Sequence, residues 1–491
     1  MKSLYYILKI DEKFHRNANI LTLLSSTTDG LKSKSLAEAI DTNPQTMKKE
    51  VSILNSELKD YISIDISQQG MVTLTFVNTS VSVDYLIMKL ARKSEVYKLI
   101  ASIYKNKARS MTQMLLDLDT AKTKTYEIIN SLNQVLAMYN IRISTKPCQF
   151  EGKESSIRIF LFDFFSVFGE PEECNPKPYK DMMGRLGRES KPPYLNLCHF
   201  RSYLWIRITT SRWATGNFIA LDPNIYRLIE YTEAEYLGFK EYHSQLITYI
   251  CQLSSLPEYE LWWAYFTTLD CISYSESDNY SYESDNYTFV RDYPYKLRDE
   301  ADALLSQVLE LHKLPERCYD MISAFVLNLS ILTQVDPAFE IVVPYQLKVN
   351  VKEKYETLCE KWRQALLFLP DNSSLRFTHI DDVAVSLTIM NMSIPPHEKD
   401  MIRVVFALQG DKGYDGYLAQ CTRSILPAFI DASFFLERIP SHSYLTRHKI
   451  DHVISNYKLD VQFPNGCKAH MLPAIPSKAD WDVLKDMLER L

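Results

Sequence analysis

Residues 36–58 read LAEAIDTNPQTMKKEVSILNSEL, and residues 111–136 return to a related pattern, MTQMLLDLDTAKTKTYEIINSLNQVL. Both stretches contain the motif Leu-Asn-x-x-Leu, and the second motif (Leu132 to Leu136) follows the first (Leu54 to Leu58) at a distance of 78 positions. Self-similarity at a fixed distance indicates a repeated structural unit. These two stretches therefore decide the fold of the first third of the chain.

The first stretch predicts a helix-turn-helix. A short helix is expected at Leu36–Ile40 and a turn at Asp41-Thr42, after which Asn43 can cap a longer helix and Pro44 can be its first residue. The longer helix has one apolar stripe, made of Met47, Val51, Leu54 and Leu58. A short helix, a brief turn and a longer helix are together typical of the helix-turn-helix motif.

The second stretch repeats this order. A short helix is expected at Met111–Leu118, a turn at Asp119-Thr120, and the start of a longer helix around Ala121–Thr125. The apolar stripe of the longer helix is made of Ile129, Leu132, Leu136 and Tyr139. Two units of the same kind are therefore expected in tandem.

A β-hairpin wing is expected after each of the longer helices. In the first copy, Ile62–Ile66 alternates apolar and polar residues, Gln69-Gly70 is a turn signal, and Met71–Phe76 can be the returning strand. In the second copy, Ile141–Ile143 alternates in the same way, and we place the corresponding turn at Glu151-Gly152. Both units are thus predicted to be winged helix-turn-helix units.

Charge is distributed unevenly along the chain. Residues 1–160 have a net charge of +6 and the remainder a net charge of −12. A basic end on an acidic body is expected where one end meets a polyanion. A recognition helix can enter the major groove of double-stranded promoter DNA, while lysines and arginines hold the phosphates.

The predicted DNA-binding residues lie at the start of the two longer helices. They are Thr42, Gln45, Thr46, Lys48, Lys49 and Ser52 in the first unit, and Lys122, Thr123, Lys124, Tyr126 and Asn130 in the second. Lys146, Lys153 and Arg158 are expected to reach phosphates from the second wing or just after it. The alternative is that both helical hairpins serve only for packing.

Composition limits the remaining possibilities. The 491 residues are 46% hydrophobic and 24% charged, as in an ordinary globular protein of several domains. We predict neither a signal peptide nor a membrane span, because the first residues are charged and the apolar runs are short. Nine scattered cysteines without a CxxC pair favour a cytoplasmic protein without a zinc site. We predict no metal, cofactor or catalytic residue.

The rest of the chain predicts a mainly α fold with one small α/β domain at its end. Long helices are expected at Ile225–Leu253, Ala301–His312, Tyr319–Gln334 and Lys352–Phe368, with an acidic linker or exposed loop at residues 275–287. After them, strands at Met401–Ala407, Ala428–Phe435 and Asp451–Ser455 alternate with helices at Tyr417–Ile425 and Ser477–Leu491, which favours a parallel sheet. Gly410, Gly413 and Gly416 match no phosphate-binding motif, so we interpret them as a tight turn.

This order of parts resembles the Mga/AtxA-type transcriptional regulators of Gram-positive bacteria. The local matches are LNSEL and LNQVL in the longer helices, FEGKESSIRIFLFDFF at residues 150–165 and HVISNY at residues 452–457. The resemblance implies two PTS regulation domains, named for the sugar phosphotransferase system (PTS), and an end similar to the IIB component of that system. The implied domains are residues 1–80 and 81–160 (winged helix-turn-helix units), 161–287 and 288–396 (PTS regulation domains) and 397–491 (the IIB-like α/β domain).

The resemblance also implies a mechanism of regulation. Such regulators are cytoplasmic DNA-binding activators of virulence or carbohydrate genes, which self-associate through the C-terminal domain and receive phosphate on histidines from a PTS phosphocarrier protein. The phosphorylation candidates are His199, near Arg201, Arg207 and Arg212, and either His379, which we favour because Arg376 is close, or His312.

One departure from the pattern concerns the C-terminal domain. Catalytic IIB domains carry a phosphate-accepting cysteine just after the first strand. Here the strand runs into Ala407-Leu408-Gln409-Gly410, and the next cysteine is Cys421, inside the following helix. We therefore predict a DNA-binding regulator that is not an enzyme. The alternatives are a phosphocarrier or phosphotransferase-type enzyme that uses this domain, and a purely structural interaction protein.

Overall fold

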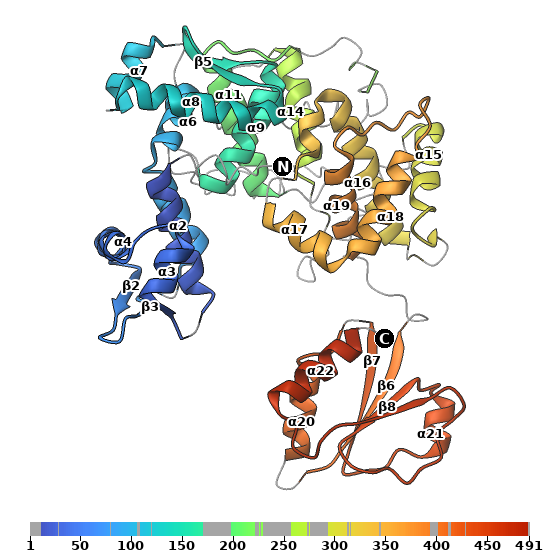
Figure 1. The fold of residues 1–491 in the computed structure, drawn as a ribbon. Coiled ribbons are helices and arrows are strands. Elements are labelled where there is room, and N and C mark those ends of the chain that lie inside the picture. Colours follow the sequence, from blue (N-terminus) through green and yellow to red (C-terminus); the bar gives the residue numbers. More distant parts are fainter. Residues whose placement is uncertain are drawn as a thin grey trace, which may run out of the picture. The chain divides into compact units, whose positions relative to one another are not determined.

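The computed structural model describes residues 11–27, 29–78, 80–105, 109–118, 120–169, 198–220, 257–272, 293–311, 316–342, 345–392, 401–410, 414–427 and 429–489, with the single residues 225, 227, 228, 274 and 314. The chain divides into two compact units. The first contains residues 1–309 and 320–390, and the second contains residues 310–319 and 391–491. Most of the helices and strands are labelled in Figure 1.

The first winged unit contains both predicted helices and both predicted wing strands. Its elements are α2 (Glu12–Ser25), β1 (Leu31–Lys32), α3 (Ser33–Ala39), α4 (Pro44–Glu57), β2 (Ile62–Ile66) and β3 (Met71–Phe76). The strands form an antiparallel sheet in the order β1-β3-β2, with Ile62 opposite Phe76. The helix α2, which we did not predict, packs against α4 and β3.

The start of α4 confirms the local signals in the sequence. The Asn43 side chain accepts a hydrogen bond from the Thr46 amide at 2.9 Å, and Pro44 is the first helical residue. The predicted stripe of Met47, Val51, Leu54 and Leu58 is buried. The opposite side of α4 is therefore left to solvent.

The second winged unit has the same order of parts. Its elements are α5 (Val83–Ala91), α6 (Glu95–Lys105), α7 (Met111–Leu118), α8 (Lys122–Leu136), η1 (Ala137–Tyr139), β4 (Arg142–Thr145) and β5 (Cys148–Glu151). The predicted stripe of Ile129, Leu132, Leu136 and Tyr139 is buried.

The turn of the second wing lies elsewhere than predicted. Thr145 pairs with Cys148, so that Lys146-Pro147 forms the turn between β4 and β5. Glu151 is the last residue of β5, and Gly152 follows it with a φ of 140°. A side chain at Gly152 would clash with Ile141, so this glycine allows a close approach of the chain after the wing rather than its turn.

The middle of the chain is helical. Its described helices are α9 (Glu154–Phe168), α11 (His199–Ala214), α14 (Glu258–Asp270), α15 (Tyr295–Leu305), α16 (Glu316–Val335), η5 (Pro337–Glu340), α17 (Tyr345–Lys354), α18 (Glu356–Leu367) and α19 (Ile380–Met392). The predicted helix Tyr319–Gln334 is confirmed within α16. The predictions for 225–253 and 275–287 fall almost wholly outside the described residues.

Two helix predictions were wrong in extent. The helix expected at 301–312 lies at α15 and ends at Leu305, where the buried stripe also ends and the Ser306 hydroxyl bonds to the Ala303 carbonyl. The helix expected at 352–368 is interrupted at Tyr355, whose backbone leaves the helical region between α17 and α18.

Among the described residues, one helical window, Cys318–Val335, is long and apolar enough to cross a bilayer, and 83% of it is buried inside the protein.

The second unit confirms the predicted parallel sheet. Strands β6 (Ile402–Leu408), β7 (Ile430–Leu436), β8 (His452–Ser455) and β9 (Lys468–Met471) pair in the order β7-β6-β8-β9, all parallel. The helices α20 (Tyr414–Arg423) and α22 (Lys478–Glu489) share a core with one face, and α21 (His442–Arg447) packs on the other. We predicted neither α21 nor β9, because both are short.

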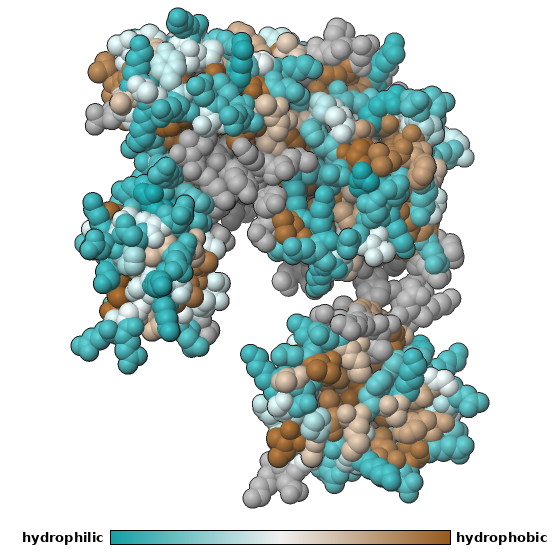
Figure 2. Space-filling view, in the orientation of Figure 1, coloured by the Kyte–Doolittle hydropathy of each residue, from teal (hydrophilic) through white to brown (hydrophobic). Residues whose placement is uncertain are grey.

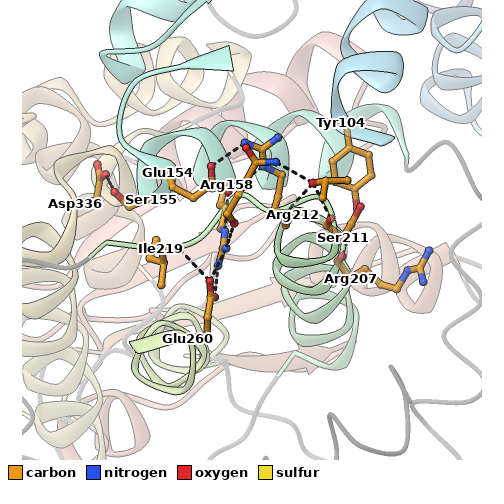
Figure 3. Close-up of polar contacts among 12 residues, drawn as sticks. Tyr104, Glu154, Ser155, Arg158, Arg207, Ser211, Arg212, Ile219, Glu260 and Asp336 are labelled. Atoms are coloured by element: carbon orange, nitrogen blue, oxygen red, sulfur yellow. Dashed lines mark hydrogen bonds and ion pairs between the residues drawn. The ribbon is translucent and has the colours of Figure 1, made fainter. Parts of the chain in front are cut away.

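A buried ionic network surrounds the first two turns of α9 (Figure 3). The Arg158 guanidinium is fully buried and donates to both carboxylate oxygens of Glu260, at 2.6 and 2.9 Å. Glu154 accepts from Arg158 and from Arg212, at 3.0 and 2.7 Å. The expectation that Arg158 reaches DNA phosphates was therefore wrong: this arginine neutralises carboxylates inside the protein.

Candidate nucleic-acid interface

The helix α4 presents a polar and basic face. Gln45, Lys48, Lys49 and Ser52 are exposed, and Thr42 and Thr46 are half-buried. Within the described part of the chain, Lys48 and Lys49 have no carboxylate within ion-pair distance. Two cationic side chains are thus available to phosphate in the first turns of α4.

The helix α8 presents a similar but less cationic face. Lys122, Thr123, Lys124 and Asn130 are exposed, and Tyr126 is half-buried. The Lys124 ammonium lies 2.6 Å from a carboxylate oxygen of Glu95, on α6. The hydrogen bond to Glu95 raises the pKa of Lys124, against the opposing effect of burial. Of the two lysines at the start of α8, one is therefore already engaged within the protein.

The second wing contributes two more exposed lysines. Lys146 lies in the turn of the hairpin and Lys153 precedes α9. The nearby Arg142 is paired with Glu151 at 2.7 Å and so is less available. Both lysines are therefore open to solvent, and their contact with a phosphate backbone stays a prediction.

The asparagine of the repeated motif holds each wing to its helix. The Asn55 side chain accepts from the Ile64 amide and donates to the Ile64 carbonyl, each at 2.7 Å. Asn133 makes the same two contacts with Ile143, at 2.7 and 3.0 Å. We noted the shared asparagine in the sequence but assigned it no role. Its repetition beside two apolar leucines was the available signal.

Replacing Asn133 with Ala is expected to destabilise the second wing by about 1–3 kcal/mol, because a partly buried amide and carbonyl of Ile143 lose their partners. Amide hydrogen exchange across β4 and β5 measures the effect. Asn130→Ala, an exposed change on the same helix, should stay within about 0.5 kcal/mol of the wild type. Equal exchange in the two variants would contradict the role of Asn133.

The predicted phosphorylation sites are only partly within the described residues. His199 is the first residue of α11, but its side chain lies outside the described part, as does His312 altogether. The arginines proposed near His199 have other partners: Arg201 pairs with Asp270 at 2.6 Å, and Arg212 is buried against Glu154. The expectation that these two are free to pair with a phosphoryl group is therefore not supported.

His379 lies just before α19 and is half-buried. Its backbone amide and that of Thr378 donate to the buried Glu340 carboxylate. Burial raises the pKa of Glu340, and the hydrogen bonds from these amides oppose the rise. Arg376 is exposed and contacts the Asp371 carbonyl at 3.3 Å. A phosphoryl group on His379 would thus lie near a buried carboxyl group, with Arg376 on the surface close by in sequence.

The carboxyl group of Asp163 connects the end of α8, the longer helix of the second winged unit, to α9. The Tyr139 hydroxyl, in η1 directly after α8, donates to Asp163 of α9 at 2.8 Å. Burial raises the pKa of Asp163 to about 8. The Tyr139 hydrogen bond and the cations of Arg201 and Lys348 oppose the rise, while Asp270 adds to it.

Asp163→Asn is expected to remove a pH dependence of stability. Because the folded-state pKa lies above the ordinary value, the native state holds the proton more tightly, and stability is lost as pH rises from about 4 through 8. The variant should therefore match the wild type in acid and have a Tm about 2–4 °C higher above pH 8. Thermal unfolding in acid and again above pH 8 checks this, with the exposed change Asp299→Asn as the control. Parallel pH profiles of the two proteins would refute it.

The turn after β6 already has internal acceptors. The Gln409 amide donates to the Asn456 side chain at 2.8 Å, and the Gly410 amide donates to the Glu437 carboxylate at 2.7 Å. A carboxylate therefore occupies one amide that a phosphate would need. Cys421 lies within α20, and no group of three or more metal-binding side chains occurs among the described residues.

Comparisons with known proteins agree with the geometry of the second winged unit. Residues 79–165 match the Mga helix-turn-helix domain. The anthrax toxin expression trans-acting positive regulator of Bacillus anthracis is 21% identical over 221 residues, which are 43% of this chain and 45% of that protein. A putative trans-acting regulator of Streptococcus pneumoniae serotype 4 is 23% identical over 225 residues, 44% of this chain and 45% of that protein. The chain thus matches under half the length of these curated relatives. The predicted resemblance to Mga/AtxA-type regulators is confirmed.

Proposed function

We propose that this chain, which resembles the Mga/AtxA-type regulators, is a DNA-binding transcriptional regulator that activates its promoters, and that it is not an enzyme. The observation that carries the proposal is the pair of helices α4 and α8, each with a buried apolar stripe and an exposed polar, basic start. The Mga helix-turn-helix match at residues 79–165 and the regulator names of both relatives support it.

The mechanism follows from the two faces. The N-terminal side chains of α4 and α8 approach base edges in the major groove, and the wings bring Lys146 and Lys153 to the phosphates. The alternative, in which both helical hairpins serve only for packing, requires these starts to be covered. The exposure of Gln45, Lys48 and Lys49 argues against it.

The test is binding of the full chain to a fluorescent promoter duplex, measured by anisotropy between about 50 and 200 mM salt. Phosphate contacts should make the affinity fall steeply as salt rises, and a promoter fragment should bind more tightly than a duplex of scrambled sequence. Affinity that is independent of both salt and duplex sequence would remove the proposal.

We further propose that PTS phosphorylation modulates this activity through His379, His199 or His312. A phosphoryl group adds about −1.5 to −2 charges. At His379 this charge would act next to the buried Glu340 and the start of α19. Mass spectrometry after incubation with a PTS phosphocarrier protein, on His→Ala variants of each candidate, would identify the histidines used.

Self-association through residues 397–491 is the third part of the proposal. Hydrophobic side chains gather on the visible face of this unit in Figure 2. Among the described residues of this unit, large apolar side chains are 55–78% exposed, namely Tyr417, Ile439, Met471, Ile475 and Val483. Exposed apolar surface of this kind favours a partner copy. Sedimentation of the full chain, with and without Ile475→Asp, tests it.

A further inference from the structure

The ion pair between Lys124 and Glu95 lies at the start of the second recognition helix. Lys124 is in the first turn of α8 and Glu95 in the first turn of α6, and their charged atoms are 2.6 Å apart. The lysine side chain is 58% exposed and the glutamate side chain 26%. Asp11, the N-cap of α2, also acts on Lys124 electrostatically. A cation that faces solvent is thus held by the carboxylate of a neighbouring helix.

Among its described residues, the first winged unit has no ion pair of this kind at the start of its recognition helix, α4. At the offset of 78 positions, Lys48 and Lys49 correspond to Tyr126 and Glu127. Lys48 and Lys49 are exposed and have no carboxylate partner among the described residues, whereas Glu127 is exposed and adds a negative charge to α8. The two recognition helices therefore offer different net charges to a duplex, although they share their fold.

We propose that Glu95 is an internal competitor of DNA, which occupies Lys124 until a phosphate displaces it. This inference rests on the proposed DNA binding and deepens it. In the free protein, Glu95 withholds one phosphate contact from the second unit. A duplex that is held only by its phosphates gains little from α8, whereas a duplex that fits the recognition helices brings a phosphate close enough to take Lys124 over.

The exposure of Lys124 makes the exchange feasible, because a phosphate can reach this side chain from solvent. An ion pair with an exposed lysine is weak and is screened by salt, so a duplex phosphate can compete with Glu95. After the exchange, Glu95 remains beside the duplex as a negative charge. Such a repulsive element lowers the affinity for duplexes that do not compensate for it, and so increases discrimination between DNA sequences. Glu95 is thus a positioning residue that acts through Lys124.

The experiment uses the full chain and two duplexes, a promoter fragment and a duplex of scrambled sequence, with Glu95→Gln as the main variant. We expect Glu95→Gln to bind the scrambled duplex about 3- to 10-fold more tightly at low salt, and the slope of log K against log salt to steepen by about 0.9, the value for one added phosphate contact. Lys124→Gln alone should change the affinity for the scrambled duplex by less than about twofold. The variant that combines Glu95→Gln with Lys124→Gln should lose the tighter binding that Glu95→Gln gives.

Glu57→Gln is the matched control. It makes the same change of net charge and frees Lys93 from a comparable pair at 2.9 Å, at the far end of α4 from its DNA-facing start. The inference is overturned if Glu95→Gln leaves the affinity and salt slope unchanged, or if Glu57→Gln produces the same gain. A wild-type chain that binds neither duplex would overturn the proposed function instead.

Discussion

Replacing both Lys48 and Lys49 with Ala is expected to weaken binding of a promoter duplex by about 10- to 100-fold and to reduce the salt slope by about two. Both lysines are exposed at the start of α4, and neither has a carboxylate partner among the described residues. Each can therefore neutralise a phosphate without first breaking an internal contact. Fluorescence anisotropy over a salt series measures both quantities.

Replacing two lysines of the second winged unit should reduce the affinity and the salt slope by less. On a duplex of scrambled sequence, Lys122→Ala with Lys124→Ala removes one available lysine and one that Glu95 already holds, so we expect a slope change nearer to one. Lys352→Ala with Lys354→Ala, two exposed residues of α17, removes the same charge outside the winged units and serves as the control. A loss in this control equal to that of the Lys48 and Lys49 variant would show a general charge effect rather than a groove contact.

Glu260→Gln is expected to destabilise the larger compact unit, residues 1–309 and 320–390, by about 3–5 kcal/mol. The reason is that the change leaves the fully buried Arg158 without its bidentate partner. Glu260 also accepts from the Ile219 amide at 3.0 Å, so the change affects two helices and a loop (Figure 3). Calorimetric unfolding of the full chain should show the loss in the transition of the larger unit.

Two further variants show whether the loss comes from the buried positive charge that Glu260→Gln leaves in excess. Glu353→Gln, an exposed change in α17, should stay within about 0.5 kcal/mol of the wild type. Arg158→Met with Glu260→Met removes both charges at similar volume, and much of the stability should return, since apolar replacement of a buried pair is often neutral. If the double variant is as unstable as Glu260→Gln, the loss of stability comes from disturbed packing and not from the buried charge.

The fold of the winged units could be predicted where the signal is local. Asn43 and Pro44 start α4 through contacts within one turn of helix, and the alternation at Ile62–Ile66 reports one buried face of a strand. The turn of the second wing was misplaced because Gly152 is a stronger turn signal than Lys146-Pro147. In the structure this glycine serves close packing against Ile141.

The roles of the charged residues could not be predicted in the same way. Arg158 resembles a phosphate-binding arginine until Glu260, 102 positions later, is placed beside it. Lys124 resembles Lys48 until α6 brings Glu95 within 2.6 Å. In both cases the partner is fixed by tertiary packing and leaves no pattern near the residue. The sequence could identify the candidate face of each recognition helix, but not which of its cations are already paired inside the protein.

The clamp made by Asn55 and Asn133 is the same in both winged units, while the side chains that α4 and α8 present are different. The scaffold is thus repeated within one polypeptide, while the side chains that it presents are not. If the proposed DNA binding holds, a chain with two unlike readers has a direction when it lies along a duplex. The stretch of DNA read by one chain then needs no internal symmetry, and inverting the part read by one winged unit while keeping the other part should abolish recognition.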